Sequence, residues 1–128
     1  MKMERLLEAL NASWSKETAY RTDQKDWSPE QKEIGQCAVT AMIVFDYFGG
    51  QIIRGTSKKY NLLHYWNEIE GKKVDLTFKQ FEGRKDDIYF TNIVVKPKEA
   101  LVRIRNVRCR YDVLKKRVES YLAQHPDI

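Results

Sequence analysis

The sequence predicts an α+β domain in which one central helix packs on an antiparallel sheet of about four strands, with further helices at the two ends of the chain. The first observation behind this prediction is the stretch from Gly35 to Gly50, GQCAVTAMIVFDYFGG. Only Thr40 and Asp46 are clearly polar in the body of this stretch, and a helix that is apolar on nearly all sides is buried against other elements. The stretch therefore predicts the central helix, with Cys37 in its first turn.

The second observation is a pair of strand-like runs, residues 62–69 and 73–78, separated by Glu70 and Gly71. A Glu-Gly pair between two such runs suggests a β-hairpin with a two-residue turn. In the register that this turn sets, the face opposite to that of residues 64 and 75 is the more apolar face of the hairpin. Either the sheet is covered on both sides or the pairing is shifted by one residue.

The third observation is helical spacing of apolar residues at both ends of the chain. Met3, Leu6, Leu7 and Leu10 predict a first helix over about residues 2–13. The spacing from Tyr111 onward predicts a last helix with basic residues on its outer face.

The remaining elements follow from local signals. Ser28 is placed as a helix N-cap, with Pro29 as first helical residue and Gln31 as capping-box partner, so a short helix is expected to lead the chain to Cys37. Three further runs predict strands, the last of them only weakly because a helical start is also possible: residues 51–54, 88–95 and 101–107.

Length and composition predict one domain over residues 1–128, with the Cys helix and hairpin (residues 28–81) as its core. No signal peptide or membrane span is recognised, so a soluble, cytoplasmic protein with no membrane partner is expected. All of the net charge of +5 comes from residues 94–128. We interpret this excess as a solvated helix surface, and nucleic acid is not an expected partner.

The residues that could carry chemistry are few. The chain has two cysteines and two histidines, and His64 lies inside a predicted strand whereas His125 lies near the end of the chain. In the hairpin register His64 and Asp75 are diagonal neighbours on one face, whereas Asn67 points to the opposite face. The register therefore favours Asp75 over Asn67 as the partner of the imidazole.

A thiolate nucleophile needs a base, and an imidazole needs a third group that fixes its tautomer. Cys37 at a helix start, where the helix dipole favours a thiolate, His64 and Asp75 can supply these three roles. The oxyanion donors would be the backbone N–H of Cys37 with the side chain of either Gln36 or Gln31. Trp66, beside the histidine, would shield the imidazole or form a wall of a substrate groove.

The segments GQCAVTAMIVFDYFGG, HYWNEIEG and VDLTFKQF together resemble the YunG-like family of uncharacterised bacterial proteins. The order of a helix-borne Cys, a strand His and an Asp on the next strand is similar to that of the papain-like and transglutaminase-like superfamily. This resemblance implies a papain-like or transglutaminase-like core. It also implies that Cys37 takes the nucleophile's place, His64 that of the base and Asp75 that of the orienting acid. Gln31 stands at the offset of the oxyanion glutamine in papain-like proteases, but the Gly35-Gln36 flank departs from the protease pattern.

These observations lead to the hypothesis of a thiol-dependent hydrolase or acyltransferase that acts on an amide or a related acyl bond of a peptide, protein or small molecule. The competing hypothesis is a non-catalytic binding or regulatory domain that keeps the fold. A sealed face around residues 64 and 75 would favour this second hypothesis. No cofactor and no metal is expected, because the chain offers no paired Cys or His motif.

Overall fold

The structure is a computed structural model and describes residues 1–84 and 87–126. Its four helices are α1 (Met3–Ser13), α2 (Cys37–Phe48), α3 (Lys98–Val102) and α4 (Val107–Gln124). Its four strands are β1 (Gln51–Ser57), β2 (Leu62–Ile69), β3 (Lys72–Val74) and β4 (Thr91–Lys96). Three short 3-10 helices, η1 (Lys16–Thr18), η2 (Arg21–Asp26) and η3 (Phe78–Arg84), complete the described elements.

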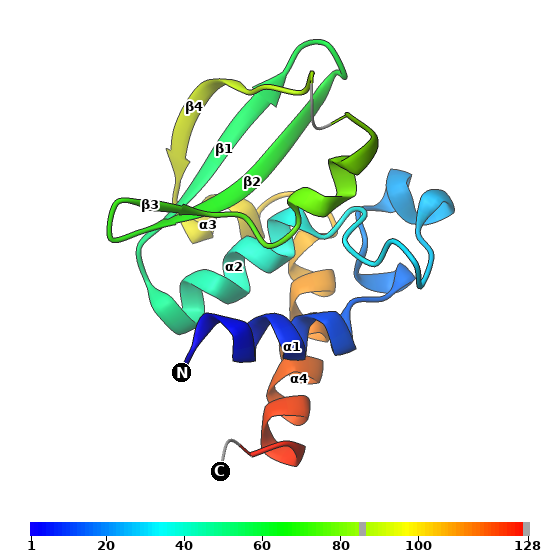
Figure 1. The fold of residues 1–128 in the computed structure, drawn as a ribbon, viewed down its shortest axis with the longest axis vertical. Coiled ribbons are helices and arrows are strands. Elements are labelled where there is room, and N and C mark those ends of the chain that lie inside the picture. The colour runs from blue at the N-terminus through cyan, green and yellow to red at the C-terminus, as the bar shows by residue number, and fades with distance from the viewer. Residues whose placement is uncertain (85–86, 127–128) are drawn as a thin grey trace.

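The strands form one antiparallel sheet in the order β3-β2-β1-β4. Figure 1 shows α2 lying along the sheet, with α1 and α4 on the side of α2 away from it. The predicted α+β architecture, with four antiparallel strands and flanking helices, is therefore confirmed. No helix within the described ranges is long and apolar enough to cross a membrane.

Helix α2 forms the middle of the hydrophobic core, where Val39, Met42 and Ile43 are fully buried. Its two polar residues are both used to hold neighbouring elements. Thr40 Oγ1 accepts a hydrogen bond of 2.9 Å from Trp14 Nε1, and Asp46 accepts hydrogen bonds from Lys98 Nζ and from the hydroxyl of Tyr111. The sequence pattern of this helix is thus explained by burial plus two specific polar contacts.

The hairpin has the predicted register, with Asn67 opposite Val74. Glu70 and Gly71 both have positive φ, 52° and 76°, as a two-residue type I′ turn requires. Because strand β3 already ends at Val74, the expected strand over residues 73–78 is too long, and the chain turns into η3 instead.

The sheet is covered on both faces, which explains why both faces of the hairpin are apolar. On one face Asn67 Nδ2 donates a 2.9 Å hydrogen bond to the carbonyl of Ala41 in α2. On the other face His64 and Trp66 lie beneath aromatic side chains, including Phe90. A register shifted by one residue is therefore not needed.

Two expected elements are wrong. Residues 28–34 form turns, because Ser28 O accepts the N–H of Gln31 at 3.0 Å and Pro29 lies at the second position of that turn. The weakly predicted strand 101–107 is instead the end of α3, a bend and the start of α4. Its alternation resembled an edge strand, but Leu101 is buried as a helix residue and Asn106, at a φ of 68°, redirects the chain.

The basic C-terminal helix does more than face solvent. Arg110 is only 6% exposed and its Nη1 donates a 3.0 Å hydrogen bond to the carbonyl of Thr18. Arg117 Nη1 donates to Ser15 Oγ at 2.7 Å. The interpretation as a purely solvated surface is therefore wrong at Arg110, because this side chain ties α4 to the segment that precedes α2.

The backbone of Gly35, in the segment that precedes α2, is held in close contact with the backbone of Tyr20. It has a φ of 76°, and a Cβ there would lie 2.7 Å from the backbone N of Tyr20. The Tyr20 N–H donates a 2.8 Å hydrogen bond to the Gly35 carbonyl, so the two backbones cannot separate without losing this contact.

We predict that Gly35→Ala lowers the free energy of unfolding by roughly 1–3 kcal/mol more than Gly71→Ala, measured by urea denaturation. Both substitutions carry the penalty of a positive φ, and Gly71 has a φ of 76° with no atom near its added Cβ. The difference between them therefore isolates the steric clash with Tyr20. Equal losses in the two variants would show that the close approach at Gly35 is not a constraint.

Candidate active site

Cys37 is the first residue of α2 and is partly exposed. Thr40 is the first residue of the helix whose N–H reaches an intrahelical acceptor, the carbonyl of Gln36 at 2.9 Å. The preceding N–H groups have no acceptor within the helix, and the side chain of Gln36 does not cap them. The thiol therefore stands at the positive end of a helix dipole, a setting that stabilises negative charge.

His64 and Asp75 form the best-defined polar pair of the described structure. His64 Nε2 and Asp75 Oδ2 are 2.6 Å apart, and the side chains are 0% and 8% exposed. Asp75 Oδ1 also accepts the backbone N–H of Thr77 at 3.2 Å, which fixes the carboxylate. Because an ionised carboxylate only accepts hydrogen bonds, Nε2 must carry the proton and Nδ1 is left for another partner.

Cys37 is among the groups that act on the imidazole. Burial by itself would lower the pKa of His64, but hydrogen bonding to Asp75 and to Cys37, together with their charges, raises it to about 9. Nδ1 itself is buried and has no hydrogen-bond partner among the described residues. Cys37 therefore lies near enough to the imidazole to influence its pKa, but makes no aligned hydrogen bond to Nδ1.

Aromatic rings enclose the imidazole. Phe81 lies edge-on to it at 4.8 Å, Phe90 stacks at 5.2 Å and Trp66 lies at 5.7 Å between ring centroids. Across the sheet His64 pairs with Gly55, where a Cβ would lie 2.7 Å from both Phe90 and Trp66. A side chain at position 55 would therefore displace the aromatic cover of the histidine.

Trp66 is 7% exposed, so its position fits shielding of the imidazole better than the wall of an open groove. Lys73 Nζ lies 4.6 Å from the Trp66 ring and covers it from the hairpin side. The face that carries residues 64 and 75 is thus sealed, and Cys37 is the one member of the three with appreciable exposure.

Of the two expected oxyanion glutamines, Gln36 has both ends of its amide bound by other residues. Gln36 is fully buried, its Oε1 accepts from Thr18 Oγ1 at 2.9 Å and its Nε2 donates to the Ser15 carbonyl at 2.9 Å. Gln31 is exposed and takes part in the turn with Ser28. The side chain of Gln36 is therefore bound by the segment around Ser15, whereas the side chain of Gln31 is exposed.

Gln80 was not singled out from the sequence. Its Oε1 accepts the N–H of Gly35 at 3.4 Å, two residues before Cys37, while its Nε2 is buried and has no hydrogen-bond partner among the described residues. Nothing in its local sequence marks it, because the contact joins residues 45 positions apart. Only the folded chain brings this amide to the start of α2.

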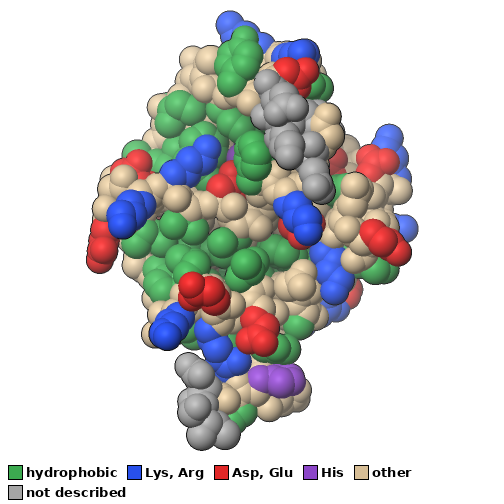
Figure 2. All heavy atoms as spheres, in the orientation of Figure 1, with side chains coloured by type: hydrophobic (Ala, Val, Ile, Leu, Met, Phe, Trp, Pro, Cys, Tyr) green, Lys and Arg blue, Asp and Glu red, His purple; other side chains and the backbone are tan. Residues whose placement is uncertain are grey.

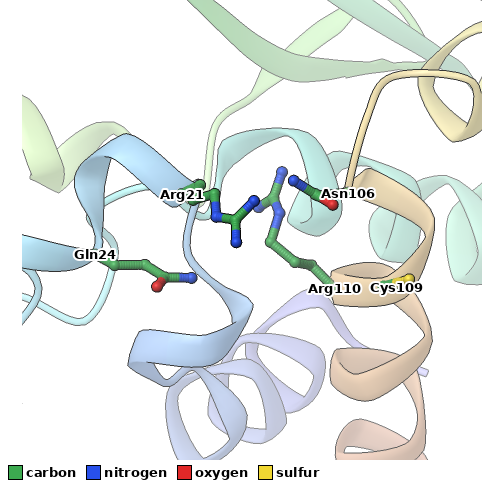
Figure 3. A pocket seen from close by; sticks show the side chains of 5 residues that line it. All are labelled: Arg21, Gln24, Asn106, Cys109 and Arg110. Carbon is green, nitrogen blue, oxygen red and sulfur yellow. The ribbon is translucent and has the colours of Figure 1, made fainter.

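Two cavities of the structure are lined by residues other than Cys37, His64 and Asp75. Figure 2 shows hydrophobic side chains gathered across the middle of one face, with charged side chains around them. A cavity of about 400 Å³ between α1 and the segment after β3 includes Leu7, Trp14 and Leu76 in its lining. A smaller cavity of about 200 Å³ is lined by Arg21, Gln24, Asn106, Cys109 and Arg110, and in Figure 3 the guanidinium groups of Arg21 and Arg110 approach one another there.

Cys109 is exposed at that smaller cavity and belongs to α4, so the structure separates it from the histidine site. Among the described residues no group of three or more His, Cys, Asp or Glu side chains is arranged to hold a metal ion.

We predict that His64 contributes to the free energy of unfolding and that this contribution decreases as the pH rises. Its folded pKa of about 9 lies above the ordinary 6.5, so its contribution is fully present below pH 6.5 and is lost as the pH rises through 9. The free energy of unfolding of the wild type minus that of His64→Gln should fall by roughly 3 kcal/mol across this window. Urea denaturation of both proteins at each pH checks it. A constant difference, or one that grows with pH, would contradict the assigned charge state.

The comparisons with known proteins agree with one another. A curated relative from Bacillus subtilis (strain 168), named "Uncharacterized protein YunG", is 34% identical to this chain over 81 residues. The matched part is 63% of this chain and 64% of the relative, so it spans less than two thirds of either protein. No solved structure matches the chain significantly, and the papain-like part of the expected fold is therefore without a structural relative to support it. The sequence profile described as YunG protein matches residues 2–123, nearly the whole chain, and the chain therefore belongs to the YunG family.

Proposed function

We propose that this protein is a thiol-dependent hydrolase or acyltransferase that acts on an amide or a related acyl bond. The observation that carries the proposal is the 2.6 Å hydrogen bond between His64 Nε2 and Asp75 Oδ2, which leaves Nδ1 available, together with the effect of Cys37 on the pKa of this ring. A nucleophile, a proton carrier and an orienting carboxylate in this order are the parts that acyl transfer through a cysteine requires.

The proposed reaction has two halves. The Cys37 thiolate attacks the carbonyl carbon of the substrate, and the π-electron pair moves to the carbonyl oxygen. The imidazolium of His64 gives its Nδ1 proton to the leaving amine, the C–N bond breaks, and a thioester remains on Cys37. Water or an amine then attacks the thioester and gives a proton back to His64, so that the thiolate and the imidazolium are restored.

Asp75 contributes without touching the substrate. Its hydrogen bond keeps the proton of the neutral ring on Nε2, and its charge stabilises the imidazolium. The pKa of His64 near 9 makes the ring an imidazolium at neutral pH, although burial by itself would favour the neutral ring. The order of Cys, His and Asp along the chain also resembles papain-like and transglutaminase-like enzymes, which supports the same chemistry by analogy.

A second candidate function is a non-catalytic binding or regulatory domain. One observation favours it: the imidazole of His64 is fully buried under aromatic rings, and neither of the cavities described above is lined by Cys37, His64 or Asp75. In that case the histidine and aspartate would be a buried structural pair.

The alkylation rate of Cys37 against pH separates the two functions. Iodoacetamide is the probe, and mass spectrometry reads Cys37 and the exposed Cys109 in the same sample. We expect Cys37 to react rapidly at pH values well below 8.5, where an ordinary thiol is mostly protonated, and His64→Gln to abolish this reactivity at low pH.

The reactivity of Cys109 should be unchanged by His64→Gln, which makes it the internal control. If Cys37 is inert in the folded protein, or reacts with the same pH profile in both proteins, the enzyme proposal fails and the binding domain stands.

A further inference from the structure

We infer that the side-chain amide of Gln80 is an oxyanion donor of this site, acting with the backbone N–H of Cys37. This inference rests on the proposed acyl transfer and adds a residue that touches the reacting atoms. It assigns to Gln80 the role that sequence analysis gave to Gln36 or Gln31.

The first reason is that Nε2 of Gln80 is buried and makes no hydrogen bond among the described residues. An unpaired buried amide destabilises the folded state, and native proteins keep few such groups. A donor that is left unpaired in the folded chain is explained if its acceptor is the substrate oxygen.

The second reason is the orientation of the amide. The N–H of Gly35 can only donate, so the atom that receives it must be Oε1, and the –NH2 group necessarily points away from that contact. Gly35 lies two residues before Cys37, at the start of α2, where the N–H of Cys37 has no intrahelical acceptor. Figure 1 shows the segment after β3 passing this end of α2.

The third reason is that one turn holds both Asp75 and Gln80. The backbone N–H of Gln80 donates to the Thr77 carbonyl at 3.0 Å, and the backbone N–H of Thr77 donates to Asp75 Oδ1 at 3.2 Å. The carboxylate that orients His64 and the amide at the start of α2 are therefore placed by the same short segment. A second donor whose position is coupled to that of the imidazole is what a preorganised oxyanion site needs.

The proposed role of Gln80 predicts that it accelerates the acylation of Cys37 but not its alkylation. When the thiolate attacks an acyl carbon, an S–C bond forms and the carbonyl oxygen gains a negative charge, which Gln80 Nε2 and the N–H of Cys37 would stabilise. When the same thiolate displaces iodide from iodoacetamide, no oxyanion forms. An oxyanion donor therefore accelerates the first reaction and leaves the second unaffected.

The test compares two reactions of Cys37 in the full chain. p-Nitrophenyl acetate acetylates the thiol and releases p-nitrophenolate, and iodoacetamide alkylates it; mass spectrometry locates both products. The measured quantity is the ratio of the acetylation rate constant to the alkylation rate constant, from which changes in thiolate fraction cancel. Gln80→Met removes the donor and keeps a neutral side chain of similar length.

We expect this ratio to fall by roughly 10- to 100-fold in Gln80→Met. Gln31→Met is the matched control, because it makes the same change at an exposed glutamine and should leave the ratio at the wild-type value. Gln80→Glu is the second variant: a carboxylate oxygen still accepts the Gly35 N–H, so the turn is retained while the donor is lost, and the ratio should fall at least as far.

Failure of this inference can be distinguished from failure of the proposed function. If wild-type Cys37 is acetylated but the ratio is the same in Gln80→Met and Gln80→Glu, Gln80 is not an oxyanion donor and the thiol chemistry stands. If wild-type Cys37 is not acetylated while Cys109 is, both the inference and the proposed acyl transfer are overturned.

Discussion

The structure depends on how the backbone of Gly35 and Gln36 is held before α2 begins. The Gly35 carbonyl accepts hydrogen bonds from the Tyr20 N–H and from Arg110, and the Gly35 N–H donates to Gln80. The side chain of Gln36 is bound at both ends by the segment around Ser15. Contacts from the N-terminal loops, from η3 and from α4 thus converge on two residues, and the next residue is Cys37. The position of the thiol is a consequence of the whole fold.

The charge state of His64 depends on two opposing effects of its surroundings. Its ring is enclosed by aromatic side chains, which would favour the neutral form, and is bonded to a carboxylate, which favours the charged form. The second effect prevails, and the pKa rises to about 9. The same enclosure that strengthens the electrostatic coupling also closes the site behind Cys37. A substrate would have to approach from the side of the thiol, with the imidazole reaching only the atoms next to sulfur.

The sequence predicted the parts of the site that follow from local periodicity. Because successive residues of a strand point to alternate faces, the spacing along β2 was enough to place His64 and Asn67 on opposite faces of the sheet. The turn at Glu70 and Gly71 fixed the register that brings Asp75 near His64. The turn over residues 28–34 was mistaken for a helix because Ser-Pro sequences begin both structures. The partners of Gln36 and Gln80 could not be predicted, since each depends on contacts between segments that only the tertiary structure brings together.

The proposed chemistry requires that the thiol of Cys37 is coupled to the imidazole of His64, and an NMR titration of the His64 ring measures this coupling. The chain has only one other histidine, His125, so the two signals can be assigned by substitution of His125. We predict a pKa of about 9 for His64 in the wild type and a clearly lower pKa in Cys37→Ala, because the hydrogen bond and the charge of Cys37 are among the causes that raise it. An unchanged His64 pKa in Cys37→Ala would contradict the coupling and leave His64 and Asp75 as a structural pair.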